Sequence, residues 1–325
     1  MQTKTSAKKL VNEFVYPICI STPFAVGDVF AYLVQDDKNI LVDTGHLSNQ
    51  SRNALKEALG KQQITLDEID EIWLTHAHPD HFGLAREIKE LSGAKIYAHP
   101  KEHLHLEHGD DPELFGQFFR EQNIPQAYIK QMGEELSWLN QFQQNLEVDH
   151  WLGDGDVLES GHLRFRVKHT PGHAPGHVIF QEESGLILAG DVLLHHISTN
   201  ALINFDPDTG QRNRSLLQLR KSLEWMEQQE GYLLPGHGIP FDNISEIARK
   251  HLDDQDMRYR KIKQLLKQNT YTLFDLTCEM FPVTGQPGTT FLTLSEVMGY
   301  LDWGMENGEI EAKKEGDVPN YTLAK

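Results

Sequence analysis

The sequence predicts an α/β fold, and three observations carry that prediction. Short apolar runs with the composition of strands alternate with segments of helical spacing. Several of the strand-like runs are followed closely by histidine or aspartate. The alternation stops at 101–147 and again from about residue 247, which predicts a helical insertion and a separate C-terminal unit. A chain of 325 residues is long enough for two domains.

The elements before residue 100 follow from short local patterns. Strands dominate 14–45, and the polar segment 36–39 is typical of a hairpin turn between two of them. Glycines are expected to end the two helices, at Gly60 and Gly93. The expected elements are strands at 32–34, 40–42, 72–74 and 96–98, and helices at 51–59 and 82–91.

The remaining elements fall into three parts. The insertion at 101–147 is rich in Glu, Gln, Leu and Phe, and reads as helices joined at Pro112 and Pro125 that could cover a site. Strands are expected at 163–168, 186–189 and 232–234, with a helix around 216–226. The tail is expected to contain helices at 247–267, 273–281 and 294–307, then a hairpin from 308–312 and 321–323. Three helices followed by a hairpin is the order of a winged helix.

Composition excludes several classes of protein. No apolar stretch approaches the roughly 20 residues that a membrane-spanning helix needs. The N-terminal lysines are not followed by an apolar run, so no signal peptide is expected. Two distant cysteines, Cys19 and Cys278, are too few for a disulfide framework and favour a cytoplasmic location. A net charge of −18 argues against a general nucleic-acid surface.

The chemistry is predicted by a cluster of metal-binding residue types. Four of them lie within six residues, and three more follow strand-like runs much later in the chain. Imidazole nitrogens and carboxylate oxygens are the ligands that zinc and similar divalent ions accept. The candidate metal ligands are His76, His78, Asp80, His81, His173, Asp191 and His237.

The spacing predicts two adjacent metal sites. His76 and His78 are two residues apart, so an extended backbone places them on the same side, whereas Asp80 and His81 lie where the chain turns into a helix. His173 is expected to complete the first site and His237 the second. The two oxygens of Asp191 could bridge both ions.

Such a pair of ions, roughly 3.5–4 Å apart, would hold a hydroxide that attacks a carbonyl or phosphoryl group. Asp80 and Asp191 are therefore also expected to act in catalysis.

The other histidines are expected to play lesser parts. His169 and His177 flank a ligand and could hydrogen-bond to the ligands rather than bind metal. Either His195 or His196 could reach the substrate. A solvent-exposed position in the insertion is expected for His103, His105 and His108.

These motifs resemble the metallo-β-lactamase superfamily over about residues 14–245, with Asp43-Thr44-Gly45 as an early marker. The resemblance implies an αββα sandwich with a two-metal site at one edge. All seven ligand positions match the pattern of glyoxalase II, lactonases and processing nucleases. Secreted β-lactamases instead carry a cysteine where this chain has Asp191, so physiological β-lactam hydrolysis is not expected.

The resemblance divides the chain into a catalytic domain at 1–246 and a winged-helix-like domain at 247–325. The residues from 249 to the end contain 10 Lys plus Arg and 12 Asp plus Glu, so the tail is not basic and is expected to serve packing or homodimerisation.

Three functions compete. The first is hydrolysis of a small thioester, lactone or ester with two divalent ions, zinc before iron or manganese. The second is a metal-dependent nuclease acting on RNA. The third is a binding module with a vestigial site, which the complete ligand set argues against.

Overall fold

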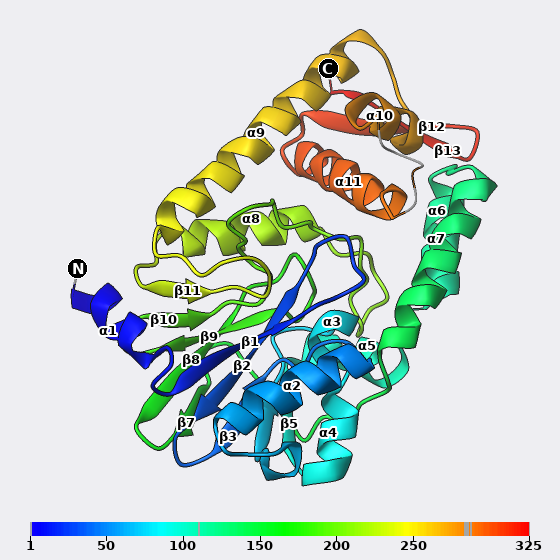
Figure 1. The fold of residues 1–325 in the computed structure, drawn as a ribbon. Helices are drawn as coiled ribbons and strands as arrows, with labels where there is room; N and C mark the ends of the chain where they lie inside the picture. Colours follow the sequence, from blue (N-terminus) through cyan, green and yellow to red (C-terminus); the bar gives the residue numbers. More distant parts are fainter. Residues whose placement is uncertain (1, 110, 283–285, 287, 325) are drawn as a thin grey trace.

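The computed structural model describes residues 2–109, 111–282, 286 and 288–324. Two sheets pack face to face, with helices on both outer faces (Figure 1). The two-sheet core is apolar, and its largest side chain is Trp73 of the first sheet. The Trp73 ring lies 5.4 Å from the ring of Phe165 and 5.3 Å from that of Phe180, both in the second sheet. The predicted αββα fold is confirmed.

The first sheet has the order β1-β2-β3-β4-β5-β6. Its first three strands are antiparallel, and β3 to β6 run parallel. Parallel neighbours place their C-terminal ends at one edge, where the loops carry most of the candidate ligands. The strands are β1 (Val15–Ile20), β2 (Val29–Gln35), β3 (Asn39–Val42), β4 (Glu71–Trp73), β5 (Lys95–Ala98) and β6 (His150–Trp151).

The second sheet has the order β11-β10-β9-β8-β7. Only β10 and β11 pair in parallel, so the loops after both strands leave from the same edge. The strands are β7 (Val157–Ser160), β8 (Leu163–His169), β9 (Val178–Glu182), β10 (Leu186–Leu188) and β11 (Tyr232–Leu234).

Helices cover the outer faces because each has an apolar side. On the first sheet lie α2 (Asn49–Lys61), α3 (Pro79–Phe82) and α4 (Ala85–Ser92). On the second lie α8 (Ser215–Met226) and the start of α9 (Ile244–Gln268). The short α1 (Gln2–Leu10) contacts β10 and β11.

Two helix boundaries differ from the predictions. Helix α2 continues through Gly60 to Lys61, and the chain turns at Gln63, whose φ is 60°. The helix expected over 82–91 begins only at Ala85, as α4, and the short α3 before it ends at Phe82. A side chain at Gly83 would collide with the carbonyl of Phe142, so glycine at this position lets a segment that is distant in sequence approach α3. Gly93 ends α4 as predicted, with φ 78°.

The insertion is helical, as expected. It contains η2 (Pro100–Glu102), α5 (His103–His108), α6 (Pro112–Glu121), α7 (Gln126–Leu139) and η3 (Asn140–Phe142). The pair α6 and α7 extends toward the C-terminal helices (Figure 1). Helix α7 contacts α11, and the Tyr321 hydroxyl donates to Gln122 Oε1 at 2.7 Å.

The tail has the expected order of three helices and a hairpin. After α9 come α10 (Leu273–Met280), α11 (Thr290–Glu306), β12 (Ile310–Glu315) and β13 (Val318–Leu323). The proposed boundary after residue 246 falls inside α9. One apolar cluster continues from the second sheet through α8 into α11, and Arg212 forms a two-bond ion pair with the buried Asp302.

Within the described part of the chain, none of the helices combines the length and the apolar character that crossing a lipid bilayer requires.

Candidate metal centre

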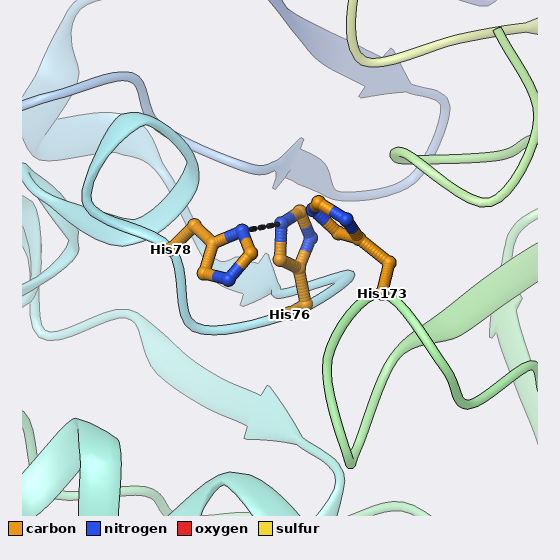
Figure 2. Close-up of side chains that lie close together, drawn as sticks. All are labelled: His76, His78 and His173. Carbon is orange, nitrogen blue, oxygen red and sulfur yellow. Dashed lines mark hydrogen bonds between the residues drawn. The ribbon is translucent and has the colours of Figure 1, made fainter. Parts of the chain in front are cut away.

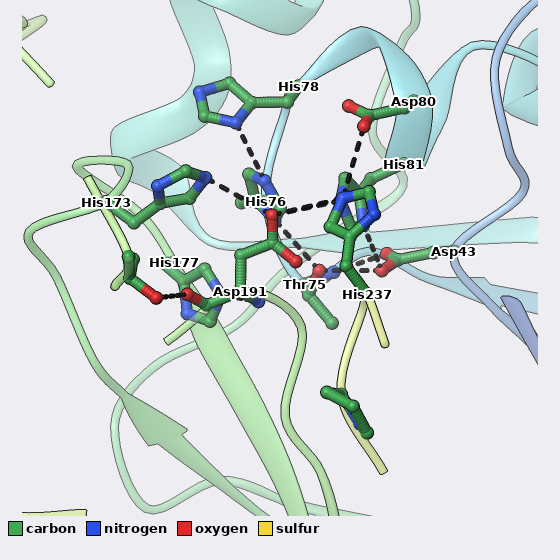
Figure 3. Close-up of polar contacts among 12 residues, drawn as sticks. Asp43, Thr75, His76, His78, Asp80, His81, His173, His177, Asp191 and His237 are labelled. Atoms are coloured by element: carbon green, nitrogen blue, oxygen red, sulfur yellow. Dashed lines mark hydrogen bonds and ion pairs between the residues drawn. The ribbon is translucent and has the colours of Figure 1, made fainter. Parts of the chain in front are cut away.

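The seven candidate ligands meet at one edge of the sandwich (Figure 3). They come from the loop after β4, from α3, and from the loops after β8, β10 and β11. Segments far apart in the sequence thus deliver side chains to one place because their strands end at a common edge. The candidate ligands are His76, His78, Asp80, His81, His173, Asp191 and His237.

The ligand atoms fall into groups that could each hold an ion. His76, His78 and His173 form the first group (Figure 2). Asp80, His81 and His237 form the second, with 3.4 Å between His237 Nε2 and Asp80 Oδ2. The atoms of each group lie within 4.8 Å of one another. A third group, His76, His81 and Asp191, takes one histidine from each of these two groups.

Asp191 lies between the two groups. Its Oδ2 is 3.5 Å from His173 Nε2 in the first group. The same oxygen is 3.5 Å from His237 Nε2 and 3.6 Å from His81 Nε2 in the second. A single carboxylate oxygen therefore faces both groups, which is the position of a bridging ligand.

The donor set fits divalent cations. The Nε2 atoms of His81, His173 and His237 are buried and have no hydrogen-bond partner. Oδ1 of Asp191 is also buried without a hydrogen-bond partner. Leaving one such polar atom unpaired costs about 1–3 kcal/mol, so four together indicate an occupant that accepts nitrogen and oxygen lone pairs. Neutral imidazole and carboxylate are the donors that zinc takes.

Burial sets the charge state of most of the imidazoles. It lowers the pKa of His76 and His78 well below the usual range, so both are neutral and can ligate. Burial alone would raise the pKa of Asp80, but His81 and His237 lower it to about 2. Burial likewise opposes protonation of His81 and His237, yet the adjacent carboxylates raise the pKa of both. A cation would neutralise those carboxylates in place of the protons.

Hydrogen bonds behind the site fix which nitrogen of His173 and of His237 faces the centre. His173 Nδ1 lies 3.0 Å from the Asn200 carbonyl, and His237 Nδ1 lies 2.7 Å from the Asp28 carbonyl. A carbonyl oxygen only accepts, so Nδ1 carries the proton and Nε2 keeps a lone pair for a metal.

Asp43 orients one histidine in each of the two ligand groups. Its carboxylate accepts from His81 Nδ1 at 2.8 Å and from the Thr75 hydroxyl at 2.7 Å. Because that hydroxyl donates to Asp43, it accepts from His76 Nδ1, which lies 3.0 Å away. Asp43 is 2% exposed, so these bonds are shielded from water. The sequence marks Asp43 only as a family feature, without this role.

Gly236 allows the loops to approach each other closely. A side chain there would collide with Asp191 Oδ1 and would contact His81 Cε1 at 2.8 Å. Only glycine therefore lets the loop after β11 pass beside both ligands.

The remaining histidines divide as follows. His177 accepts from the backbone N–H of Asp191 at 3.0 Å and so supports a ligand, as expected. His195 lies beside the Phe241 ring, and His196 is exposed next to Gly238. His108 is exposed as predicted.

The prediction of a solvent-exposed position is wrong for two histidines of the insertion. His103 and His105 are half-buried. His103 Nδ1 lies 2.9 Å from the Pro100 carbonyl, and the His105 ring packs against Phe82.

Comparison with known proteins identifies the family. The chain matches the model of the metallo-beta-lactamase superfamily over residues 25–237. It is 29% identical over 321 residues to the probable metallo-hydrolase YqjP of Bacillus subtilis, covering 90% of this chain and 92% of the relative. It is 26% identical over 220 residues to the probable metallo-hydrolase MJ0888 of Methanocaldococcus jannaschii, covering 66% of this chain and 90% of the relative.

Solved structures extend the likeness to nearly the whole chain. The metallo-beta-lactamase family protein TTHA1429 of Thermus thermophilus superposes with a TM-score of 0.83 at 25% identity, covering 97% of this chain and 99% of that one. The subclass B3 metallo-beta-lactamase BJP-1 of Bradyrhizobium japonicum covers 76% of this chain and 94% of its own, at 21% identity and a TM-score of 0.53, which shows the fold alone. The chain thus belongs to the metallo-beta-lactamase superfamily and is a metal-dependent hydrolase.

Proposed function

We propose that the chain is a two-metal hydrolase of a small thioester, lactone or ester. The observation that carries the proposal is the position of Asp191 Oδ2, which faces His173 on one side and both His81 and His237 on the other. When bound, two divalent ions supply a Lewis acid and lower the pKa of water to near 7.

The protein's own residues hold and orient that centre. His76, His78 and His173 would hold the first ion, whereas Asp80, His81 and His237 would hold the second. Asp191 joins the two, and with Asp80 supplies the negative charge of the site. Zinc fits these donors best, with iron or manganese as alternatives.

Charge and architecture favour a small substrate. A net charge of −18 repels polyanions over the molecule as a whole. The Phe142 carbonyl of the insertion accepts from Leu47 N at 2.8 Å, next to the α3 segment that carries Asp80 and His81. A site bordered by a helical insertion suits a small ligand better than a long polymer.

The test is a panel of thioesters, lactones and esters offered to the metal-loaded protein. Asp191→Ala should abolish the metal-dependent rate because it removes the ligand shared by both groups. The exposed Asp253 provides a matched control, and Asp253→Ala should behave like the unaltered protein. Equal rates for Asp191→Ala and the unaltered protein across the whole panel would refute the proposal.

The alternative is a metal-dependent nuclease, and one observation favours it. A surface groove on the tail is lined by Arg260, Lys263 and Lys267 of α9. Lys263 is paired with Glu309 at 2.8 Å, which reduces the positive charge of the groove. Single-stranded RNA at low salt separates the two functions: metal-dependent cleavage that Asp191→Ala abolishes would establish the nuclease, and intact RNA would remove it.

We propose that the tail is a winged-helix-like packing module. Its order from α9 to β13 supports this assignment, as does its contact with the catalytic part. In particular, Ser295 Oγ of α11 accepts from the Ile203 N–H at 3.1 Å, three residues after Asn200, whose carbonyl orients His173. Homodimerisation through this tail stays a prediction.

A further inference from the structure

An aromatic cluster lies beside the candidate metal centre. It consists of Phe24 in the loop between β1 and β2, Trp138 near the end of α7 and Phe142 of the η3 turn. The rings of Phe24 and Trp138 are 5.7 Å apart, those of Phe24 and Phe142 are 5.2 Å apart, and those of Trp138 and Phe142 are 4.9 Å apart. Their planes meet at 74–85°, the edge-to-face arrangement that aromatic rings prefer.

The cluster is fixed to the ligand-bearing helix. The Phe142 carbonyl accepts from Leu47 N and lies against Gly83, the residue that ends α3. His46 packs against the cluster, and its ring is 5.6 Å from those of Phe24 and Phe142. Phe142 therefore anchors the cluster against the α3 turn, which carries Asp80 and His81 of the second ligand group.

Much of this apolar surface faces solvent. Trp138 is 42% exposed, and Phe24 and Phe142 are each partly exposed. The three side chains already pack on one another, yet they leave a hydrophobic face beside a polar, charged centre. Clustered apolar side chains next to a few convergent polar groups are typical of a small-molecule site.

We propose that Phe24, Trp138 and Phe142 form an apolar subsite that receives the acyl chain of the substrate. This inference rests on the proposed function, because it places the scissile carbonyl at the metal centre and the chain against the rings. The preferred substrates are then medium-chain acyl thioesters or esters rather than acetyl compounds. His46, buried and hydrogen-bonded to Ser51 at 2.9 Å, supports the rings from behind.

The test uses one thiol acylated with acetyl, butanoyl, hexanoyl and octanoyl groups. Burial of each methylene is worth about 4-fold in kcat/KM, since it contributes ~0.8 kcal/mol. For the metal-loaded protein, kcat/KM should rise along the series, chiefly through a lower KM. Trp138→Ala and Phe24→Ala should lower the octanoyl-to-acetyl ratio at least 10-fold.

Trp151 of β6 supplies the matched control, because it is also 42% exposed and lies outside the cluster. Trp151→Ala should keep the full dependence on chain length. Phe24→Leu, which preserves apolar volume, should restore most of the ratio lost in Phe24→Ala. Metal content and far-UV circular dichroism of each variant establish that it is folded and loaded.

A binding measurement separates this inference from the proposed function. Calorimetry with octanoate and with acetate reports the subsite without any turnover. The unaltered protein should bind octanoate at least 10-fold more tightly than acetate, and Trp138→Ala should lose this preference. That result would support the subsite even if every thioester resists hydrolysis. Thioester hydrolysis without chain-length dependence, together with equal binding of octanoate and acetate, would overturn the subsite and leave the proposed function standing.

Discussion

Replacing Asp43 with asparagine tests how the metal ligands are oriented. The Asp43 carboxylate accepts three hydrogen bonds, from Thr75 N at 2.9 Å, the Thr75 hydroxyl at 2.7 Å and His81 Nδ1 at 2.8 Å. An asparagine has almost the same shape but only one acceptor oxygen. With that oxygen toward Thr75 N, its NH₂ group faces His81. With the amide flipped, the NH₂ group faces the Thr75 N–H.

The first orientation changes both ligand groups. His81 Nδ1 must then accept, so its proton moves to Nε2, the atom that faces Asp191. The Thr75 hydroxyl must also accept from the amide, which turns its own hydrogen toward His76 Nδ1. Loss of such an outer hydrogen bond typically weakens metal binding by about 10- to 100-fold, or ~1.4–2.8 kcal/mol. Asp43→Asn should therefore lower the affinity for both ions by at least this factor.

The assay is competition for zinc with a chromophoric chelator, combined with urea unfolding of the metal-free protein. Glu71 gives a matched control because it is buried at the other end of β4 and accepts from Trp73 Nε1 at 2.8 Å and Lys38 at 2.7 Å. Glu71→Gln should cost about 1–3 kcal/mol of stability and leave zinc affinity unchanged. Unchanged zinc affinity in a folded Asp43→Asn protein would refute the reasoning.

Further predictions concern the metals, the tail and pH. His173→Ala and His237→Ala remove ligands from different groups, so each should reduce bound metal from two ions to one per chain by elemental analysis; retention of two ions in both would contradict the grouping. Chelation should lower the melting temperature, because ligand at 100 times its Kd stabilises by about 2.7 kcal/mol. Ser295→Ala should weaken metal binding at the His173 side, and the nearby Thr293→Ala should not. Burial would raise the pKa of Asp149, but bonds from Ile96 N, Lys89 and Lys95 lower it to about 2. This carboxylate thus stabilises the fold above its unfolded pKa of about 4 and loses that effect as pH falls toward 2, so Asp149→Asn should flatten acid unfolding in that window.

The convergence of the candidate ligands could be predicted because their signal is local. Each follows a strand-like run, and strands that end at one edge bring their following residues together whatever the length of chain between them. His173 and His237 are separated by 64 positions, yet each needs only its own strand to place it. The same logic predicted the element order of the tail, where helical spacing is unambiguous over long segments.

The features that sequence reasoning missed depend on tertiary contacts. The close approach of the Phe142 carbonyl to Gly83 is one such contact. The hydrophobic periodicity over 82–91 carries no information about a contact between Gly83 and Phe142, which is 59 positions away. Likewise, the backbone carbonyls of Asp28 and Asn200 hold His237 and His173. Every residue has such a carbonyl, so the amino-acid sequence cannot indicate which ones accept these bonds. Of the groups that orient the ligand histidines, only Asp43 could have been found from the sequence. An aspartate that directly follows an apolar strand is expected to be buried and to need hydrogen-bond donors.

The candidate site depends both on local sequence and on contacts between distant segments. Local sequence selects which atoms could bind metal, whereas distant segments decide which nitrogen of each imidazole is free to do so. The loop at 199–203 illustrates the division, since Thr199 donates to the Asp191 carbonyl at 2.7 Å, Asn200 orients His173, and α11 holds the loop through Ser295. The tail therefore contacts the loop whose Asn200 carbonyl orients His173. A catalytic unit truncated before α9 would keep all seven ligands but lose the contact that positions this loop, so it should bind metal less tightly than the full chain.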